Sequence, residues 1–235
     1  LLIDDSGLRS KVTAIGLNSP ITVGNSKGKS ALYFLAGKPE GQRLLIADNT
    51  LRDKITADGL NAVIAEGLYK GYSPLLFLAA SSEGRQLLKD DEVLRGKITT
   101  EGLNAVVHEG EFKGFSTLIF LAGTPEGRQL LIDDAGLRGK ITSKGLNSVI
   151  SAGKYKAYSA LWYLASNPKE RWFFINNDEV LRSKISAEGL NTVIAEGEFK
   201  DWSALLFLVG DQEGLRLLIA DNNLRDKINA DGLNA

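Results

Sequence analysis

Residues 99–110 read TTEGLNAVVHEG, and close copies of this stretch recur along the whole chain. A Gly-Leu-Asn triplet aligns the copies, and successive triplets begin 43, 43, 43, 44 and 43 residues apart. The triplets are Gly16-Leu17-Asn18, Gly59-Leu60-Asn61, Gly102-Leu103-Asn104, Gly145-Leu146-Asn147, Gly189-Leu190-Asn191 and Gly232-Leu233-Asn234. A constant period of this length is typical of arrays in which each repeat buries its apolar face against its neighbours. The spacing therefore predicts a tandem repeat protein.

The same spacing predicts one repeat array over residues 1–235. The expected repeats are a partial repeat at 1–29, complete repeats at 30–72, 73–115, 116–158 and 159–202, and a partial repeat at 203–235. Neither end carries the polar capping repeat that a complete array needs. We therefore expect the sequence to be a fragment of a longer protein.

Composition narrows the classes of partner. The hydrophobic fraction of 43% and the charged fraction of 24% are ordinary, and a net charge of -1 gives no overall attraction to nucleic acid or to an anionic membrane. No apolar run approaches the roughly 18 residues that span a bilayer, so no membrane partner is expected. The absence of cysteine excludes disulfides, thiolate metal sites and cysteine nucleophiles, and it leaves the compartment open.

The first two helices of a repeat have clear start signals. In the repeat that begins at residue 73, Ser73 is a preferred N-cap residue. Pro74 stands at the first helical position, where its missing N–H does no harm. The residues that follow, 75–79, are apolar on every side, which predicts a buried helix. A second cap-type residue, Ser81, begins a helix of about eight residues that carries the Leu87-Leu88 pair.

The third helix begins at an aspartate that stands four residues before an arginine, as in Asp48 and Arg52 or Asp91 and Arg95. The spacing predicts an N-cap and an ion pair within the same helix. The fourth helix begins at Thr99 and is expected to run to Gly110, where a left-handed residue would end it. The one extra residue of the fifth repeat falls before Asp178, which places it in a loop at 176–177. The fold class is thus an all-α solenoid with three to four short helices per 43-residue repeat.

Residues 71–80, GYSPLLFLAA, resemble the opening of an ankyrin repeat, Gly-x-Thr-Pro-Leu-His-x-Ala-Ala, with Leu76 in the place of the histidine. The repeat length and the several helices per repeat are similar to those of armadillo or HEAT repeats. Armadillo repeats carry an asparagine on the helix that lines their groove, where it binds an extended peptide. The resemblance implies an α-solenoid that binds macromolecules, and it implies the same peptide-binding role for Asn61, Asn104, Asn147 and Asn191.

These asparagines have two interpretations. Asparagine is a poor helix former, so its recurrence in every copy needs a cause. The favoured cause is a hydrogen-bonded ladder between stacked repeats, and the alternative is a ladder that binds a partner.

Two columns of aromatic residues run along the repeats. The column directly before the N-cap serine has an aromatic residue five positions later, the spacing of a hydrophobic staple. Its pairs are Tyr72 with Phe77, Phe115 with Phe120, Tyr158 with Tyr163, and Trp202 with Phe207. In the other column, each aromatic residue is followed by lysine. This pattern predicts either an edge that binds a partner or, equally, aromatic rings that pack on the loop of the next repeat. Its pairs are Tyr69-Lys70, Phe112-Lys113, Tyr155-Lys156 and Phe199-Lys200.

The chain is expected to be a protein or peptide binding scaffold. An Arg-x-Lys pair, such as Arg95 and Lys97, recurs in all six copies and would suit a nucleic-acid-binding array as the second interpretation. A structural spacer or rod, self-associating head to tail through uncapped ends, is the third. His108 is the single histidine, and no acid–base pair, nucleophile or metal constellation is found, so neither catalysis nor a cofactor is expected.

Overall fold

The structure, a computed structural model, describes residues 5–233. Over these residues the regular secondary structure is helical, and an isolated antiparallel bridge joins Val149 and Ser159. The prediction of an all-α fold is confirmed. The chain divides into two compact parts, Leu1–Phe112 and Lys113–Ala235, which are described in turn.

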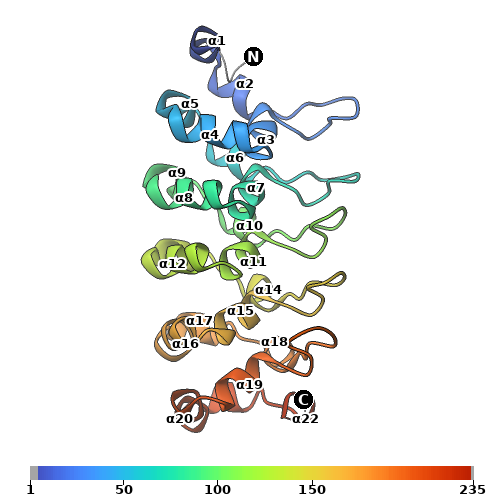
Figure 1. Ribbon diagram of the computed structural model, residues 1–235, viewed down its shortest axis with the longest axis vertical. Coiled ribbons are helices and arrows are strands. Elements are labelled where there is room, and N and C mark those ends of the chain that lie inside the picture. The colour runs from blue at the N-terminus through green and yellow to red at the C-terminus, as the bar shows by residue number, and fades with distance from the viewer. Residues whose placement is uncertain (1–4, 234–235) are drawn as a thin grey trace. The chain divides into compact units, whose positions relative to one another are not determined.

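In the first part each complete repeat supplies four short helices. The helices are α1 (Ser6–Lys11), α2 (Ala14–Asn18), α3 (Ala31–Ala36), α4 (Pro39–Ala47), α5 (Asn49–Asp53), α6 (Ala57–Asn61), α7 (Pro74–Ala80), α8 (Ser82–Asp90), α9 (Glu92–Gly96) and α10 (Thr100–Asn104). Helices that hold the same place in successive repeats pack on one another (Figure 1): α3 on α7, α4 on α8, α2 on α6, and α6 on α10.

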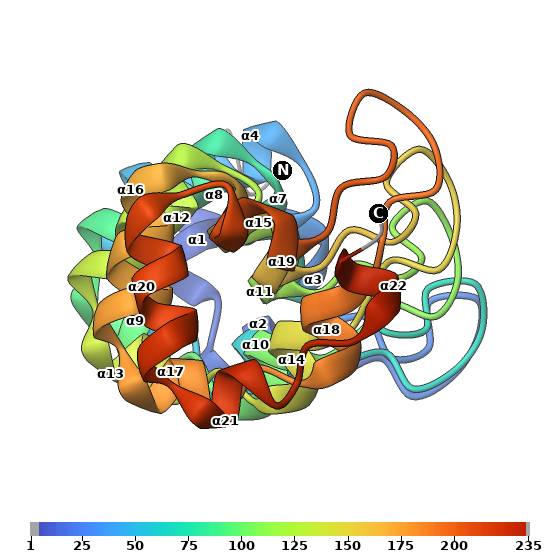
Figure 2. The same cartoon turned by 90° about the horizontal axis from the view of Figure 1, so that it is seen from below.

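The second part is built in the same way. Its helices are α11 (Thr117–Ala122), α12 (Pro125–Asp133), α13 (Ala135–Gly139), α14 (Ser143–Asn147), α15 (Ala160–Ser166), α16 (Pro168–Arg171), the π-helix η1 (Trp172–Asn177), α17 (Glu179–Ser183), α18 (Ala187–Asn191), α19 (Ala204–Val209), α20 (Gln212–Ala220), α21 (Asn222–Arg225) and α22 (Ala230–Leu233). Here α15 packs on α11 and α19, and α18 packs on α14 and α22. Figure 2 shows α18, α19 and α22 close together near the C-terminal end.

The helix starts follow the predicted caps. The Ser73 hydroxyl accepts from the N–H of Leu76, and the Asp91 carboxylate accepts from the N–H of Leu94. Ser81 and Thr99 cap their helices in the same way. The first helix of the repeat is buried as predicted, since Leu75, Leu76, Leu78 and Ala79 of α7 are at most 1% exposed.

The hydrophobic staples are also confirmed. The ring centroids of Tyr72 and Phe77 lie 5.7 Å apart. The other three pairs are Phe115 and Phe120 at 4.9 Å, Tyr158 and Tyr163 at 5.5 Å, and Trp202 and Phe207 at 4.7 Å. Each staple directs the chain from the loop into the first helix of its repeat.

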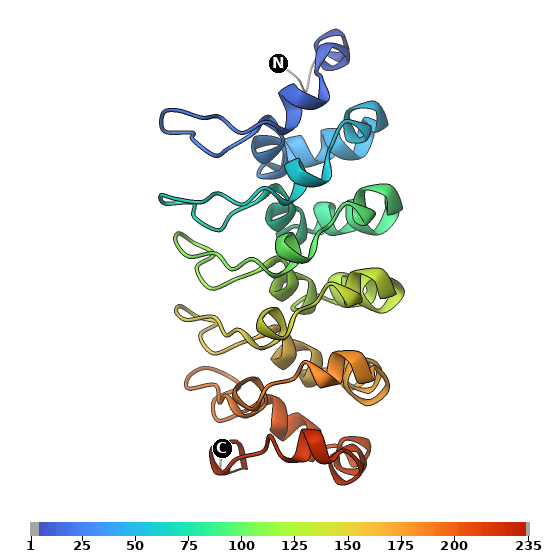
Figure 3. The same ribbon diagram turned by 180° about the vertical axis from the view of Figure 1, so that it is seen from behind.

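The fourth helix is shorter than predicted. In the second repeat α6 ends at Asn61, and Gly67 has its expected positive φ of 80° in a loop beyond the helix. The backbone bonds across this loop instead of along a helix, because Ile64 donates to the Tyr72 carbonyl and Gly71 donates to the Ile64 carbonyl. Figure 3 shows such loops projecting from the helices. Residues 62–72 and 105–115 are therefore loops, and we call them the second and third loops.

The extra residue of the fifth repeat lies in a helix, which corrects the prediction of a loop there. Residues Trp172–Asn177 form η1, which continues directly from α16. A π-helical turn holds one more residue than an α-helical turn, so it absorbs a single insertion without breaking the helix. Asp178 consequently keeps its place as the cap of α17, where it accepts from the N–H of Leu181.

Candidate functional site

The asparagine of the Gly-Leu-Asn triplet joins successive repeats. Asn61 is 8% exposed, and its Nδ2 donates to the Ala57 carbonyl of its own helix at 2.7 Å and to the Lys97 carbonyl of the next repeat at 2.8 Å. Its Oδ1 accepts from the N–H of Thr99, the cap of α10, at 3.0 Å. One side chain thus bonds to three backbone groups, two of them in the following repeat. These are the bonds that a ladder between repeats requires.

The glycine of the triplet makes room for this asparagine. A Cβ placed on Gly102 would lie 2.0 Å from Oδ1 of Asn61, well inside van der Waals contact. A Cβ on the equivalent glycines would lie equally close to an asparagine Oδ1. The distances are 2.0 Å from Gly59 to Asn18, 2.0 Å from Gly189 to Asn147, and 2.1 Å from Gly232 to Asn191. Sequence reasoning missed this role of the glycine, although the constant separation of glycine and asparagine carried the signal.

The other predicted asparagines lie at the same place. Asn147 donates to the Lys184 carbonyl and accepts from the N–H of Ser186. Asn191, which is 5% exposed, bonds to the Lys227 carbonyl and to the N–H of Asn229. Asn104 donates to the Thr100 carbonyl at 2.6 Å. These amides bond to the chain's own backbone, so the candidate site consists of other residues.

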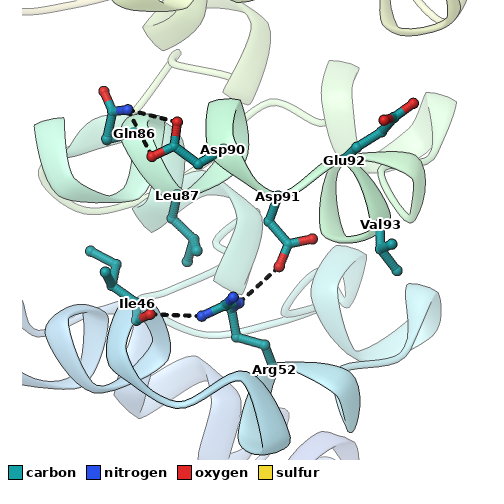
Figure 4. Close-up of a pocket in the computed structure, with 8 residues that line it drawn as sticks. All are labelled: Ile46, Arg52, Gln86, Leu87, Asp90, Asp91, Glu92 and Val93. Atoms are coloured by element: carbon teal, nitrogen blue, oxygen red, sulfur yellow. Dashed lines mark hydrogen bonds and ion pairs between the residues drawn. The ribbon is translucent and has the colours of Figure 1, made fainter.

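The recurrent arginine pairs with the next repeat. Arg52 Nε lies 2.8 Å from Asp91 Oδ2, and its Nη1 donates to the carbonyls of Leu45 and Ile46 at the end of α4. Figure 4 shows the guanidinium between Ile46 and Asp91. The predicted pair with Asp48 of the same helix is wrong, because the carboxylate of Asp48 is taken by the Arg9 guanidinium and the Leu51 N–H.

The same pairing recurs elsewhere. The pairs are Arg9 with Asp48 at 3.0 Å, Arg138 with Asp178 at 3.3 Å, and Arg182 with Asp221 at 2.7 Å. The lysine two residues after the arginine also contacts a neighbouring repeat: Lys97 Nζ donates to the Ile55 carbonyl at 2.7 Å, and Lys184 Nζ donates to the Ile141 carbonyl at 2.6 Å. The arginines and lysines of the Arg-x-Lys pairs therefore stabilise the packing surface between successive repeats, which we call the seam.

Hydrogen bonds lower the pKa of the seam carboxyls. For Asp48 and Asp221 the chief cause is the bond from the N–H of Leu51 or Leu224. Burial of Asp91 raises its pKa, but the bonds from the Leu94 N–H and the Arg52 guanidinium outweigh this effect, so the net pKa is below the ordinary value of 3.8. Such carboxyls stabilise the fold above their unfolded pKa, and the stabilisation is lost as the pH falls through the folded pKa.

We expect the free energy of unfolding to fall as the pH is lowered from about 5 to about 2. The variant Asp91→Asn keeps an oxygen that caps α9 but loses the charge facing Arg52. It should be less stable than the parent by about 1 to 2 kcal/mol at pH 7, and this difference should shrink as the pH falls. Urea unfolding followed by circular dichroism measures both effects. The control Asp58→Asn removes the same charge from an exposed position of α6. A pH-independent difference for Asp91→Asn would contradict the assignment.

The aromatic and lysine column lies on the loops. Its lysines are all exposed, whereas its rings are only partly so, with Tyr69 and Tyr155 at 44% and 41% exposure and Phe112 and Phe199 half-buried. Each ring also touches a neighbour: Phe112 stacks on Tyr72 at 5.8 Å, Tyr155 meets Phe115 at 5.9 Å, and Phe199 meets Trp162 at 5.0 Å. The rings of this column therefore pack on neighbouring aromatic residues and also remain partly exposed to solvent.

These rings open onto a groove in the first part, with a volume of about 670 Å³. The second loop supplies Leu68, Tyr69 and Tyr72, and the third loop supplies Glu111 and Phe112. Helices and helix caps complete the lining with Pro39, Gln42, Phe77, Ser81 and Glu83. The groove is thus assembled from two successive repeats, 30–72 and 73–115, and it is mostly aromatic and apolar with a few polar groups at its edge.

The walls of the groove are held in place by named contacts. Tyr72 is 4% exposed, and its hydroxyl accepts from the N–H of Phe112 at 3.1 Å, which ties the third loop to the second. The N–H of His108 donates to the Lys70 carbonyl and adds a second tie. The hydroxyl of Ser82 donates to Glu83 and lowers the pKa of its carboxyl, so Glu83 is charged at neutral pH. The site is therefore a preformed aromatic groove with negative charge at its edge.

A second cavity, of about 400 Å³, lies beside the Arg52 pair (Figure 4). Asp90, Asp91 and Glu92 line it, together with the exposed apolar side chains of Ile46 and Val93. Both oxygens of Asp90 accept from Gln86 Nε2 at 2.8 Å, and Asp91 binds Arg52. Two of its three carboxylates are thus occupied by contacts within the chain.

Two further findings concern the described residues as a whole. No group of three or more His, Cys, Asp or Glu side chains among them is placed to hold a metal ion. None of their helices has the length and apolar character needed to cross a membrane.

Comparison of the chain with protein-family models, with curated proteins and with solved structures found no match in any of the three.

Proposed function

We propose that this chain is a binding scaffold for another protein or peptide, and that it is an α-solenoid of 43-residue helical repeats. The groove of the first part is the proposed binding site. The packing of equivalent helices in successive repeats, α3 on α7 and α6 on α10, supports the solenoid. The observation that carries the function is the aromatic lining contributed by loops of two successive repeats.

The groove has the properties of a peptide-binding surface. Exposed or half-exposed aromatic rings supply most of the binding energy in protein interfaces, and Tyr69 and Phe112 have this character. Leu68, at 78% exposure, adds apolar surface at the rim. The ties between the loops hold the rings in place before a ligand arrives, which reduces the entropy lost on binding. An extended segment that lies across the second and third loops would contact all three residues.

Binding to nucleic acid is the second candidate, and the exposed lysines of the loops favour it. A lysine follows the aromatic residue in each of these four loops. The lysines are Lys70, Lys113, Lys156 and Lys200. The arginines do not add to this surface, since Arg52 and its counterparts bond to carboxylates and carbonyls of the seam. A chain with a net charge of -1 would depend on these lysines alone. Retention on a DNA column that weakens steeply with salt would support this candidate.

The test of peptide binding is selection from a displayed library of random peptides, followed by fluorescence polarisation with the selected sequences. We expect peptides that lose about tenfold in affinity for Tyr69→Ala, because removing an aromatic anchor costs at least about 1.4 kcal/mol. The matched control is Tyr155→Ala, which removes the equivalent, equally exposed ring from the second part, and it should change the affinity less than twofold. Selection that yields no binder, or binders indifferent to Tyr69, would refute the proposal.

A further inference from the structure

The groove carries negative charge and no positive charge in its lining. Its charged side chains are Glu83, which belongs to α8, and Glu111, which belongs to the third loop. Among the described residues, no lysine or arginine lines it. A purely apolar ligand would displace water from these carboxylates without supplying an opposite charge, which is unfavourable. The charge therefore favours a cationic group in the ligand.

The aromatic rings present faces and edges suited to the same group. Tyr69 and Tyr72 meet edge to face, with ring centroids 5.5 Å apart and planes at 84°. Phe112 stacks on Tyr72 at 26°. A cation within about 6 Å of an aromatic face is attracted by the quadrupole of the ring, and most strongly when water is excluded. Tyr69 and Phe112 are the partly exposed members of this cluster, so their rings can contact an ammonium or guanidinium group, while buried Tyr72 holds them in place.

The protein already contains one such contact beside the groove. The Lys29 ammonium lies 3.9 Å from the ring centroid of Tyr69 and 5.7 Å from that of Tyr33. Lys29 stands at the place that Tyr72 holds in the next repeat, directly before the N-cap serine. It does not line the groove. The ring of Tyr69 thus binds an ammonium within the chain, and the groove offers the same chemistry to a ligand.

We propose that the occupant of the groove is an extended peptide that inserts an arginine or lysine side chain between the aromatic rings and the carboxylates of Glu83 and Glu111. The proposal rests on the proposed function and specifies the partner of that same site. The remaining apolar surface, which includes Leu68 and Pro39, would contact the flanking residues of the peptide. Binding should weaken with ionic strength, because part of the attraction is electrostatic.

The experiment uses peptides selected from the random library and the whole chain. We expect the selected peptides to share a basic residue, and replacing that residue by glutamine should weaken binding about tenfold or more. Glu83→Gln and Glu111→Gln should each weaken binding about fivefold and should reduce its salt dependence. The control Glu109→Gln removes an exposed carboxylate from the same loop, two residues from Glu111 and outside the lining, and should have little effect. Thermal melts should show that all three variants are folded.

The outcomes separate this inference from the function on which it rests. Peptides that depend on Tyr69 but share no basic residue, or that bind the double Glu83→Gln, Glu111→Gln variant as tightly as the parent, would overturn the inference and leave peptide binding intact. Failure to select any peptide would overturn both. Loss of binding to the double variant, with peptides that require their basic residue, is the result that supports the inference.

Discussion

Replacing Asn61 and Asn147 together by alanine should lower the free energy of unfolding by about 4 kcal/mol, about 2 kcal/mol at each site. Each amide bonds to a carbonyl and an N–H of the following repeat, at 2.8 and 3.0 Å in both cases. Alanine would leave these backbone groups without their partner in a largely buried seam. The two sites lie in different parts of the chain and share no partner, so their effects should add.

Urea unfolding followed by circular dichroism measures this loss. The matched control is Asn49→Ala, which removes an exposed asparagine at the start of α5 and should change the free energy by no more than about 0.5 kcal/mol. A loss below about 1 kcal/mol in the double variant would show that water replaces the seam bonds at little cost. The peptide-binding role of the asparagines would then need to be examined.

The variant Gly102→Ala should lose about 3 kcal/mol, although it adds only one methyl group. The new Cβ would meet Asn61 Oδ1 at 2.0 Å and Asn61 Cγ at 2.6 Å, so the amide must leave its place and lose its bonds to the next repeat. At Gly96 a Cβ would meet no atom within 4 Å. Gly96→Ala is therefore the control, and we expect it to be neutral or to stabilise α9 by up to about 1 kcal/mol.

A double-mutant cycle makes this prediction sharper. Once Asn61 is alanine, its Oδ1 and Cγ are gone and only its Cβ, at 2.8 Å, remains close to the new methyl group, so Gly102→Ala should cost less. The two changes together should therefore fall short of the sum of their separate costs by at least about 1 kcal/mol. Strict additivity would mean that the glycine is needed for its backbone alone, and the geometric explanation of the Gly-Leu-Asn triplet would be wrong.

The seam and the groove use different residues of the same repeat. Asparagine, arginine and the lysine after it bond to backbone and carboxylates of neighbouring repeats, as Asn61, Arg52 and Lys97 illustrate. The loop rings combine the two tasks, since Phe112 both packs on Tyr72 and lines the groove. Changes at exposed Tyr69 are consequently better probes of binding than changes at buried Tyr72, which also holds the loops together.

Local rules were sufficient for the helix caps and the staples, whose residues lie three to five positions apart, but they gave the wrong partner for the arginine four residues after the aspartate. Ser73, Asp91 and Thr99 cap helices at the predicted places, and the pair of Tyr72 and Phe77 forms the predicted staple. The partners of these contacts are neighbours in the sequence, so their spacing alone identifies them. The all-α class and the burial of the first helix follow from the same kind of pattern.

The spacing of residues within one helix could not identify hydrogen-bond and ion-pair partners that lie in the next repeat. Spacing within a helix suggested Asp48 for Arg52, but the carboxylate that it meets is Asp91, 39 residues on, because packing of α8 on α4 brings the start of α9 to Arg52. The same packing gathers the groove from residues between Ala36 and Phe112.

The loop after Asn61 closes through bonds of its own, from Ile64 to the Tyr72 carbonyl and from Gly71 to the Ile64 carbonyl, which the helix pattern did not indicate. The sequence by itself determined where helices begin and that the fold is all-α. The tertiary structure decided which repeat satisfies which polar group, because those contacts form only when the repeats pack.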